Sequence, residues 1–172
     1  MRLLLASVLL VLSASGNSAL AQPTNPSAPS PGEANNIAYR ILFQRTLLYK
    51  KLADQADAAH QPKPYLRRIL ANRYALSDDD NASLERIAIA YQAALKPVHE
   101  QRMAIVNLYR ARFPFGVVPP GADVTPPAAL AESQQQEDAV TLLYRDLLHN
   151  SMREENFQKM NLKVTSDFGG HR

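Results

Sequence analysis

The sequence contains no cysteine, which excludes disulfide bonds, thiolate metal sites and the lipid-bearing residue of a bacterial lipoprotein. Tryptophan is also absent, and only 6 glycines occur among 172 residues. Alanine, leucine, glutamine, arginine and glutamate are abundant instead, a mixture that favours helices. No alternation of polar and apolar residues indicates a β-strand. We therefore expect an all-α fold.

Metal-binding motifs are also missing. His99 is followed by Glu100, but the second histidine of a zinc-protease pair does not follow one helical turn later. Asp57 and His60 share a helix face, and no third ligand accompanies them. The sequence therefore predicts no metal-binding residue and no cofactor.

Catalytic signatures are equally scarce. Most serines lie in the N-terminal region or at helix caps, and neither a Gly-x-Ser-x-Gly elbow nor a glycine-rich phosphate loop occurs. We expect no catalytic or cofactor-binding residue and a protein that is not an enzyme. The alternative, an enzyme or metal-binding protein with an unfamiliar site, requires His99, Glu100 and Arg102 to converge in a buried pocket with another polar group.

The N-terminus has the pattern of a secretory signal. Met1–Arg2 supplies a positive start, Leu3–Leu12 is almost entirely apolar, and Ala19-Leu20-Ala21 matches the small-x-small pattern that signal peptidase reads before Gln22. An apolar run of about ten residues is half of what spans a bilayer. The sequence therefore predicts a signal peptide over residues 1–21, no transmembrane span in the mature chain, and a periplasmic protein, with secretion as the alternative.

The remaining chain divides by composition. Residues 22–36 are rich in proline, serine and asparagine and predict a disordered spacer. Residues 37–168 carry helical periodicity and predict one domain, followed by a frayed tail over residues 169–172. We expect four to five antiparallel helices in an elongated hairpin or bundle, at about 37–59, 65–74, 78–112, 128–148 and 154–168.

Apolar periodicity also predicts which faces are buried. In the first helix we expect a stripe of Ile37, Ile41, Leu48 and Leu52, broadened by Leu42, Phe43 and Leu47. In the long helix the stripe runs from Leu84 to Tyr109, with Pro97 predicting a kink halfway. The fourth helix should bury Leu130, Val140, Leu143, Tyr144 and Leu147, and the fifth Phe157, Met160, Asn161 and Val164.

Several side chains have the pattern of helix caps. Asn35 and Asn36 precede the first helix, and Ser77 with Asp80 begins the long one. Thr125 before two prolines predicts a cap with proline at the first helical position. Ser151 and Glu154 predict a capping box for the last helix.

Charge is distributed unevenly, although the net charge is only +3. Eight basic residues lie between Arg40 and Arg73, and seven acidic residues between Asp123 and Glu155. The two regions can attract each other across a helical bundle. The alternative is a basic face for an anionic partner, either a membrane surface or an acidic polypeptide. Nucleic acid is not an expected partner of an exported protein.

Short patterns resemble a family of exported, all-helical bacterial proteins that has no known activity. The resemblance covers residues 37–168 and rests on these strings: Tyr39-Arg40-x-Leu42-Phe43, Leu76-Ser77-x-x-Asp80, Leu84-x-x-Ile87-Ala88, Phe113-Pro114, Pro119-Pro120-Gly121 and Phe157-x-x-Met160. Two helix starts are more distantly similar to the Leu-Thr-x-x-Gln repeats of the Spy/CpxP-type periplasmic proteins. Residues 76–80 carry aspartate where that repeat has glutamine, and residues 150–154 replace both its leucine and its glutamine.

The second resemblance implies a curved helical hairpin whose apolar and basic surface binds polypeptides. We therefore expect a non-enzymatic protein that binds unfolded or envelope polypeptides, as a chaperone or stress sensor does. The alternative is a structural helical module that self-assembles into a homo-oligomer through the exposed part of its long helix.

Overall fold

The protein is all-α, as the sequence predicts. A computed structural model describes residues 31–113 and 116–168, which form five helices and no strand. The predicted signal peptide, most of the predicted spacer and the predicted tail lie outside these residues. The helices are α2 (Pro31–Ala58), α3 (Tyr65–Tyr74), α4 (Asp78–Ala111), α5 (Ala128–Asn150) and α6 (Glu154–Phe168).

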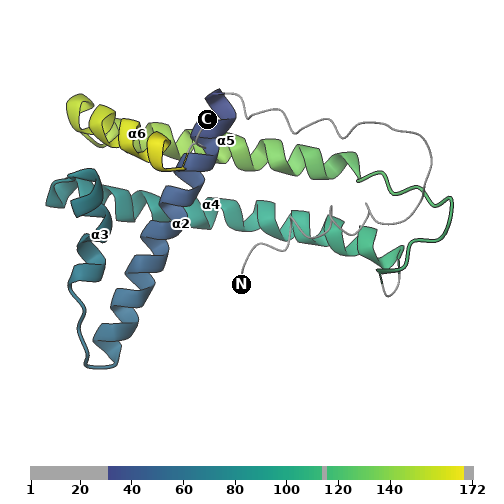
Figure 1. Cartoon of the computed structure of the whole chain (residues 1–172), viewed down its shortest axis with the longest axis horizontal. Helices are drawn as coiled ribbons and strands as arrows, with labels where there is room; N and C mark the ends of the chain where they lie inside the picture. Colours follow the sequence, from purple (N-terminus) through teal and green to yellow (C-terminus); the bar gives the residue numbers. More distant parts are fainter. Residues whose placement is uncertain (1–30, 114–115, 169–172) are drawn as a thin grey trace.

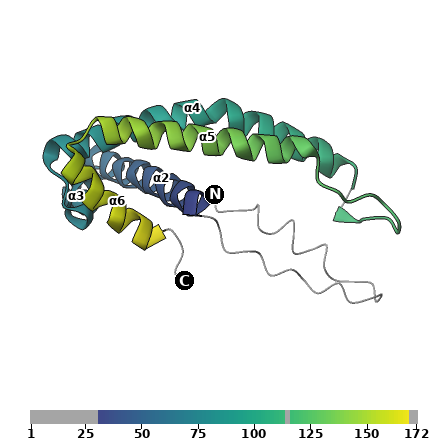
Figure 2. The same ribbon diagram turned by 90° about the horizontal axis from the view of Figure 1, so that it is seen from above.

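Two long helices, α4 and α5, form an antiparallel hairpin that curves along its length (Figures 1 and 2). The 34 residues of α4 continue as one helix through Pro97 and are about 51 Å long. Helix α2 crosses this hairpin steeply, α3 returns beside α2, and α6 packs on α2 (Figure 1). The turn between α4 and α5 therefore lies at the end of the molecule opposite α3 and α6. Among the described residues, no helix is both long and apolar enough to cross a bilayer.

The core lies where α2 crosses the hairpin. Phe43 of α2 contacts Tyr91 of α4 with ring centroids 4.7 Å apart, and Tyr39 stacks on Phe157 of α6. The Tyr39 hydroxyl donates to Asn161 Oδ1 at 2.8 Å, so this buried phenol keeps a polar partner. Fully or nearly buried apolar side chains come from every helix: Ala38, Tyr39, Leu42, Phe43, Leu70, Tyr74, Leu84, Ala88, Tyr91, Leu95, Leu148, Phe157, Met160 and Val164.

The predicted start of the long helix is confirmed. Ser77 Oγ accepts from the Asp80 backbone N–H at 3.1 Å and donates to the Asp80 carboxylate at 2.7 Å. The same carboxylate oxygen accepts from Asn156 Nδ2 of α6 at 2.9 Å. The cap therefore also ties α6 to the first turn of α4.

Three other predicted helix caps are wrong. Helix α2 begins at Pro31, because a residue without an N–H suits the first turn, so Asn35 and Asn36 lie inside the helix. Helix α5 begins at Ala128, as predicted, but its N-cap residue is Pro127 and not Thr125, whose N–H donates to Asp123 Oδ1 within the connection. Ser151 caps the C-terminus of α5 and donates to the Leu148 carbonyl oxygen instead of opening α6.

The predicted inner faces of α2 and α5 are also wrong in part. Ile37, Leu48 and Leu52 are exposed, because α2 turns Tyr39, Leu42, Phe43 and Thr46 inward. The Thr46 hydroxyl is satisfied by the Leu42 carbonyl oxygen at 2.9 Å and can therefore be buried. On α5, Leu143 and Leu147 are exposed, and the inner positions are Ser133, Glu137, Thr141 and Leu148.

The predicted attraction between the basic and acidic regions is found at one basic residue, Arg40 of α2, which lies 2.7 Å from Asp138 of α5. Arg73 of α3 instead lies 2.8 Å from Asp167 of α6, which is outside the predicted acidic region. Other basic residues of the first half pair locally, as Arg67 does with Asp54. Charge therefore links elements distant in sequence mainly around Arg40, where three helices meet.

Candidate functional site

A buried carboxylate lies where α2, α4 and α5 meet. Glu137 of α5 is only 4% exposed. Its Oε2 accepts from Arg102 Nη1 of α4 at 2.7 Å, and its Oε1 lies 3.5 Å from Arg40 Nη1 of α2. His99 Nε2, one turn before Arg102, lies 3.3 Å from the same Oε1. Two guanidinium groups and an imidazole thus surround one carboxylate. We call these residues, with Asp138 and Gln134, the ionic cluster.

The rest of the ionic cluster joins the two guanidinium groups. Asp138 Oδ1 accepts from Arg40 Nη2 at 2.7 Å and from Gln134 Nε2 at 3.3 Å. Gln134 Oε1 accepts in turn from Arg102 Nη1 at 3.2 Å. Two arginines therefore balance two carboxylates, and the net charge of the cluster is close to zero when His99 is neutral.

Helical spacing explains how α4 and α5 supply these groups. Residues three and four apart lie on one helix face, so Gln134, Glu137 and Thr141 follow one another along α5. Thr141 Oγ1 donates to the Glu137 carbonyl oxygen at 2.8 Å and lies 3.1 Å from the Tyr91 hydroxyl. Burial raises the pKa of Tyr91, which keeps this phenol neutral beside the cluster. The polar face of α5 is thus continuous from the ionic cluster into the core.

Some buried polar atoms around the cluster have no hydrogen-bond partner among the described residues. They are Arg40 Nε, Arg102 Nε, Ser133 Oγ and Asn36 Oδ1. Both arginines thus use their terminal nitrogens for the carboxylates and leave the inner nitrogen unpaired. An incompletely satisfied network contributes less to stability than its number of ion pairs suggests.

The structure brings together two of the three residues that an unfamiliar active site would require. His99 and Arg102 converge on Glu137, whereas Glu100 is exposed and lies 3.9 Å from Lys96. Each charged group of the cluster faces an opposite charge, and none of them is a nucleophile held beside a base. The geometry suits a connection between three helices better than acid–base chemistry on a substrate.

Sequence reasoning missed Arg40 and Glu137. One signal for Glu137 was present, since Ser133, Glu137 and Thr141 recur every four residues and mark a polar stripe on an otherwise amphipathic helix. No local signal marks Arg40, because its partner Asp138 is 98 positions away in the sequence.

Metal binding has little support in the described part of the chain. No three histidine, aspartate or glutamate side chains gather there closely enough to hold an ion. Asp57 pairs with Arg67 Nη2 at 2.8 Å, and His60 lies exposed in the turn after α2 with φ 54°. The two residues that share a helix face in the sequence therefore have separate surroundings.

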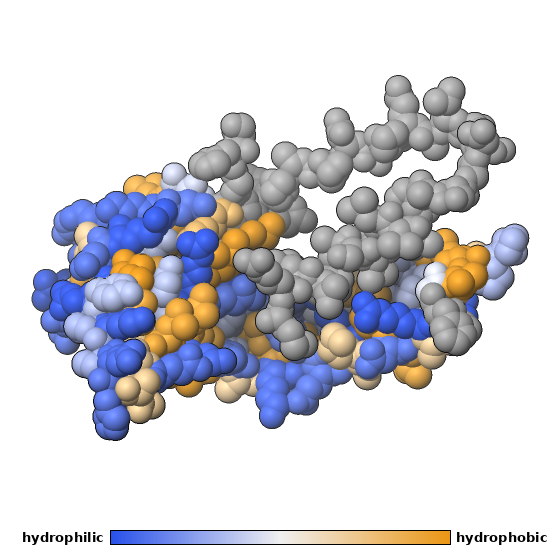
Figure 3. Space-filling view, turned by 60° about the horizontal axis from the view of Figure 1, so that its bottom comes forward, coloured by the Kyte–Doolittle hydropathy of each residue, from blue (hydrophilic) through white to orange (hydrophobic). Residues whose placement is uncertain are grey.

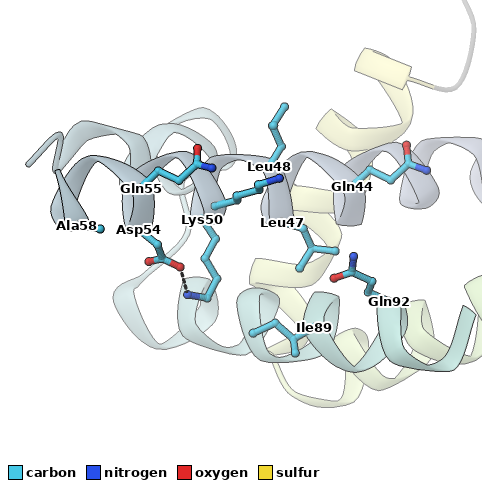
Figure 4. Close-up of a pocket in the computed structure, with 10 residues that line it drawn as sticks. Gln44, Leu47, Leu48, Lys50, Asp54, Gln55, Ala58, Ile89 and Gln92 are labelled. Carbon is cyan, nitrogen blue, oxygen red and sulfur yellow. Dashed lines mark hydrogen bonds and ion pairs between the residues drawn. The ribbon is translucent and has the colours of Figure 1, made fainter. Parts of the chain in front are cut away.

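An open groove of about 620 Å³ lies in the angle between α2 and α4 (Figure 4). Leu47 points toward α4, where Ile89 and Gln92 lie, whereas Leu48 projects from α2 away from α4 (Figure 4). Lys50 donates to Asp54 at 2.8 Å along one side. The lining residues are Gln44, Leu47, Leu48, Lys50, Lys51, Asp54, Gln55, Ala58, Ile89 and Gln92. The groove combines leucine and isoleucine side chains with amides and lysines, and it contains no residue of the ionic cluster.

No protein-family model, curated protein or solved structure matches this chain. The ionic cluster and the groove are therefore the observations from which a function can be argued.

Proposed function

We propose that this chain is an exported, non-enzymatic protein of the cell envelope that binds other polypeptides, as a chaperone or stress sensor does. The observation that carries the proposal is the groove between α2 and α4. Leu48 and Ile89, from two different helices, are 50% and 47% exposed there, and both are large apolar side chains. Exposed apolar side chains that gather in a concave surface are typical of interaction sites.

The lining of the groove suits a polypeptide better than a small rigid ligand. Gln44, Gln55 and Gln92 offer amide donors and acceptors that can pair with a peptide backbone. Leu47 and Ile89 offer apolar contact area between them. A segment with alternate apolar side chains can use both at once, which is how extended peptides are recognised.

The proposed location in the envelope rests on the N-terminal pattern of residues 1–21. Its short positive start, apolar run and Ala19-Leu20-Ala21 ending are those of a cleaved export signal. The resemblance to Spy/CpxP-type periplasmic proteins supports the same location and the same class of polypeptide-binding activity.

A charge placed in the groove tests the proposal. We expect the protein to delay the aggregation of an unfolded client, measured by light scattering, and the double variant Leu48→Glu/Ile89→Glu to lose this delay. Both side chains are half exposed, so the variant should keep its helical circular dichroism. Leu162→Glu is the matched control, since Leu162 is exposed on α6 and outside the groove. A wild-type protein that gives no delay, or a control that loses it equally, would contradict the proposal.

A second candidate function is self-assembly through the outer half of α4. Residues 103–111 are mostly apolar around the whole helix, yet none of them is buried, and Met103 and Leu108 are 51% and 74% exposed. A helix that is apolar all round is normally covered. If this function is correct, sedimentation equilibrium should show an oligomer at high concentration, and Met103→Glu/Leu108→Glu should be monomeric. A monomer at every concentration would remove this candidate.

A further inference from the structure

One side of α4 is exposed along the helix and yet mostly apolar. Leu84, Tyr91 and Leu95 are buried on the side that packs against the rest of the fold. On the opposite side, at helical spacing, the exposed apolar residues beyond the groove are Ala93, Pro97, Met103, Ala104, Leu108 and Ala111. We call these six residues, together with Lys96 and Glu100, the outer face. Figure 3, in which the underside of the molecule comes forward, shows hydrophobic residues at the surface toward the far end of the hairpin. A helix face that stays in water is normally polar or charged, so this composition indicates a partner.

Only two charged side chains belong to the outer face, and they have opposite signs. Across residues 89–109 the other charged or basic side chains are His99 and Arg102, and both face the ionic cluster. Lys96 and Glu100 are one helical turn apart, and their side chains are 75% and 67% exposed. Lys96 Nζ lies 3.9 Å from Glu100 Oε1, and an ion pair this long and this exposed is weak. Both groups are therefore open to pairing with another chain.

A lysine and a glutamate one turn apart on one face are self-complementary when two copies of the helix run antiparallel. In a symmetric contact, residue i of one copy meets residue j of the other, and j meets i. With the twofold axis at position 98, Lys96 of each copy meets Glu100 of the second copy. The same register sets Ala93 opposite Met103, a small side chain against a large one, so the two helices can approach closely. A parallel pair would instead bring like charges together.

We propose that two copies of this chain associate through their outer faces as an antiparallel pair of α4 helices, with Lys96 and Glu100 at the centre. This inference rests on self-assembly, the second candidate function, and specifies the face, the direction and the register of the contact. A strongly acidic or basic polypeptide would find no net charge on this face, whereas a second copy matches both of its charges. The pair extends over residues 85–111, about 40 Å. One helix pair buries less area than an obligate dimer, so we expect a reversible equilibrium.

The ends of the pair add little net attraction. In this register Glu85 and Arg86 of one copy approach the exposed Arg110 and Arg112 of the other. Each end thus combines attraction to a glutamate with repulsion from an arginine, and the two largely cancel. The central contacts between lysine and glutamate therefore determine the direction of pairing.

Charge exchange tests the pairing, with the dissociation constant measured by sedimentation equilibrium of the purified protein. Lys96→Glu and Glu100→Lys should each raise this constant at least about tenfold, because a symmetric dimer loses two exposed ion pairs that each contribute about threefold. An equimolar mixture of the two variants should dimerise like the wild type, because the glutamates of one variant then meet the lysines of the other. Lys159→Glu is the matched control and should dimerise normally, since Lys159 of α6 is also exposed and one turn from a glutamate.

Introduced cysteines report the register directly, because the chain has none of its own. Oxidation of a mixture of Ala93→Cys and Met103→Cys should give a disulfide-linked heterodimer. Either variant alone should give little, because position 93 of one copy lies about 15 Å along the helix from position 93 of the other. A disulfide joins Cα atoms that are less than about 7 Å apart.

Three results would overturn the proposal: a monomer at every concentration, a mixture of charge variants that dimerises no better than either alone, or Ala93→Cys that links to itself in preference to Met103→Cys. A monomer would remove self-assembly as well. If Met103→Glu/Leu108→Glu is monomeric but charge exchange restores nothing, self-assembly remains and only this register is removed. None of these results alters the expected delay of client aggregation by the groove.

Discussion

Replacement of Glu137 by alanine should lower the free energy of unfolding by about 3 kcal/mol. Removing one member of a buried ion pair typically costs about 3–5 kcal/mol, because the other charge stays buried without a partner. Here the Arg40 and Arg102 side chains remain 21% and 18% exposed, so water can reach them in part and the lower end applies. Urea unfolding followed by circular dichroism measures the loss, which corresponds to a fall in Tm of about 10 °C.

The matched control for this prediction is Glu132→Ala. Glu132 is also a glutamate of α5, but it is exposed. Its replacement should change the free energy of unfolding by no more than about 0.5 kcal/mol. Equal losses in Glu132→Ala and Glu137→Ala would contradict the ionic cluster as a stabilising connection.

A triple variant distinguishes the net contribution of the ionic cluster to the free energy of unfolding from the penalty for leaving a buried charge unpaired. Apolar residues of similar size in place of a whole buried ion network are often neutral or stabilising. Replacing Arg40, Arg102 and Glu137 together by methionine should therefore recover most of the stability that Glu137→Ala loses. If the triple variant is less stable than Glu137→Ala, the ion pairs stabilise the folded state more than the packing of three methionines can.

The elements of this fold that could be predicted from sequence are those fixed by local interactions. The apolar residues of α4 at three- and four-residue spacing predict its buried face, and Leu84, Tyr91 and Leu95 are indeed buried. Ser77 caps α4 through the backbone of Asp80, only three residues on. Proline and glycine predict the connections between helices because each restricts or frees the backbone conformation at its own position.

The elements that could not be predicted depend on contacts distant in sequence. Periodicity assigns Leu143 and Leu147 to the core, but α5 instead turns Glu137 and Thr141 inward. A buried glutamate is stable only with its partners, and one of these, Arg40, belongs to a helix that crosses α5 in the folded state. The polar stripe through Glu137 indicates a distinct face of α5, but nothing in the sequence around Glu137 identifies Arg40 as its partner or predicts the crossing.

The candidate site, like the fold, could be predicted from sequence only where its residues lie close together in one helix. His99 and Arg102 are one helical turn apart, so their common face follows from spacing alone. Glu100 lies between them in sequence but on another side of the helix, where it is exposed beside Lys96. The groove was not predictable, because its two walls belong to helices whose crossing depends on the whole core.

Leu42→Ala and Leu48→Ala form a matched pair that tests the orientation of α2. Both are leucines of one helix, and periodicity alone puts Leu48 in the main buried stripe. In the structure Leu42 is 0% exposed and Leu48 is 50% exposed. Truncation of a buried leucine leaves a cavity and costs about 2–5 kcal/mol, whereas a half-exposed leucine loses only part of its transfer free energy, about 1 kcal/mol or less.

The difference between the two variants measures the rotation of α2 directly, because helix propensity and residue type are the same at both positions. We expect Leu42→Ala to be less stable than Leu48→Ala by at least about 1 kcal/mol in urea unfolding. The reverse order would mean that α2 packs through its Ile37 and Leu48 face. In that case Arg40 would turn away from Glu137, and Leu48, one of the residues that line the groove, would be buried. The ionic cluster and the proposed binding surface therefore depend on the same orientation of one helix.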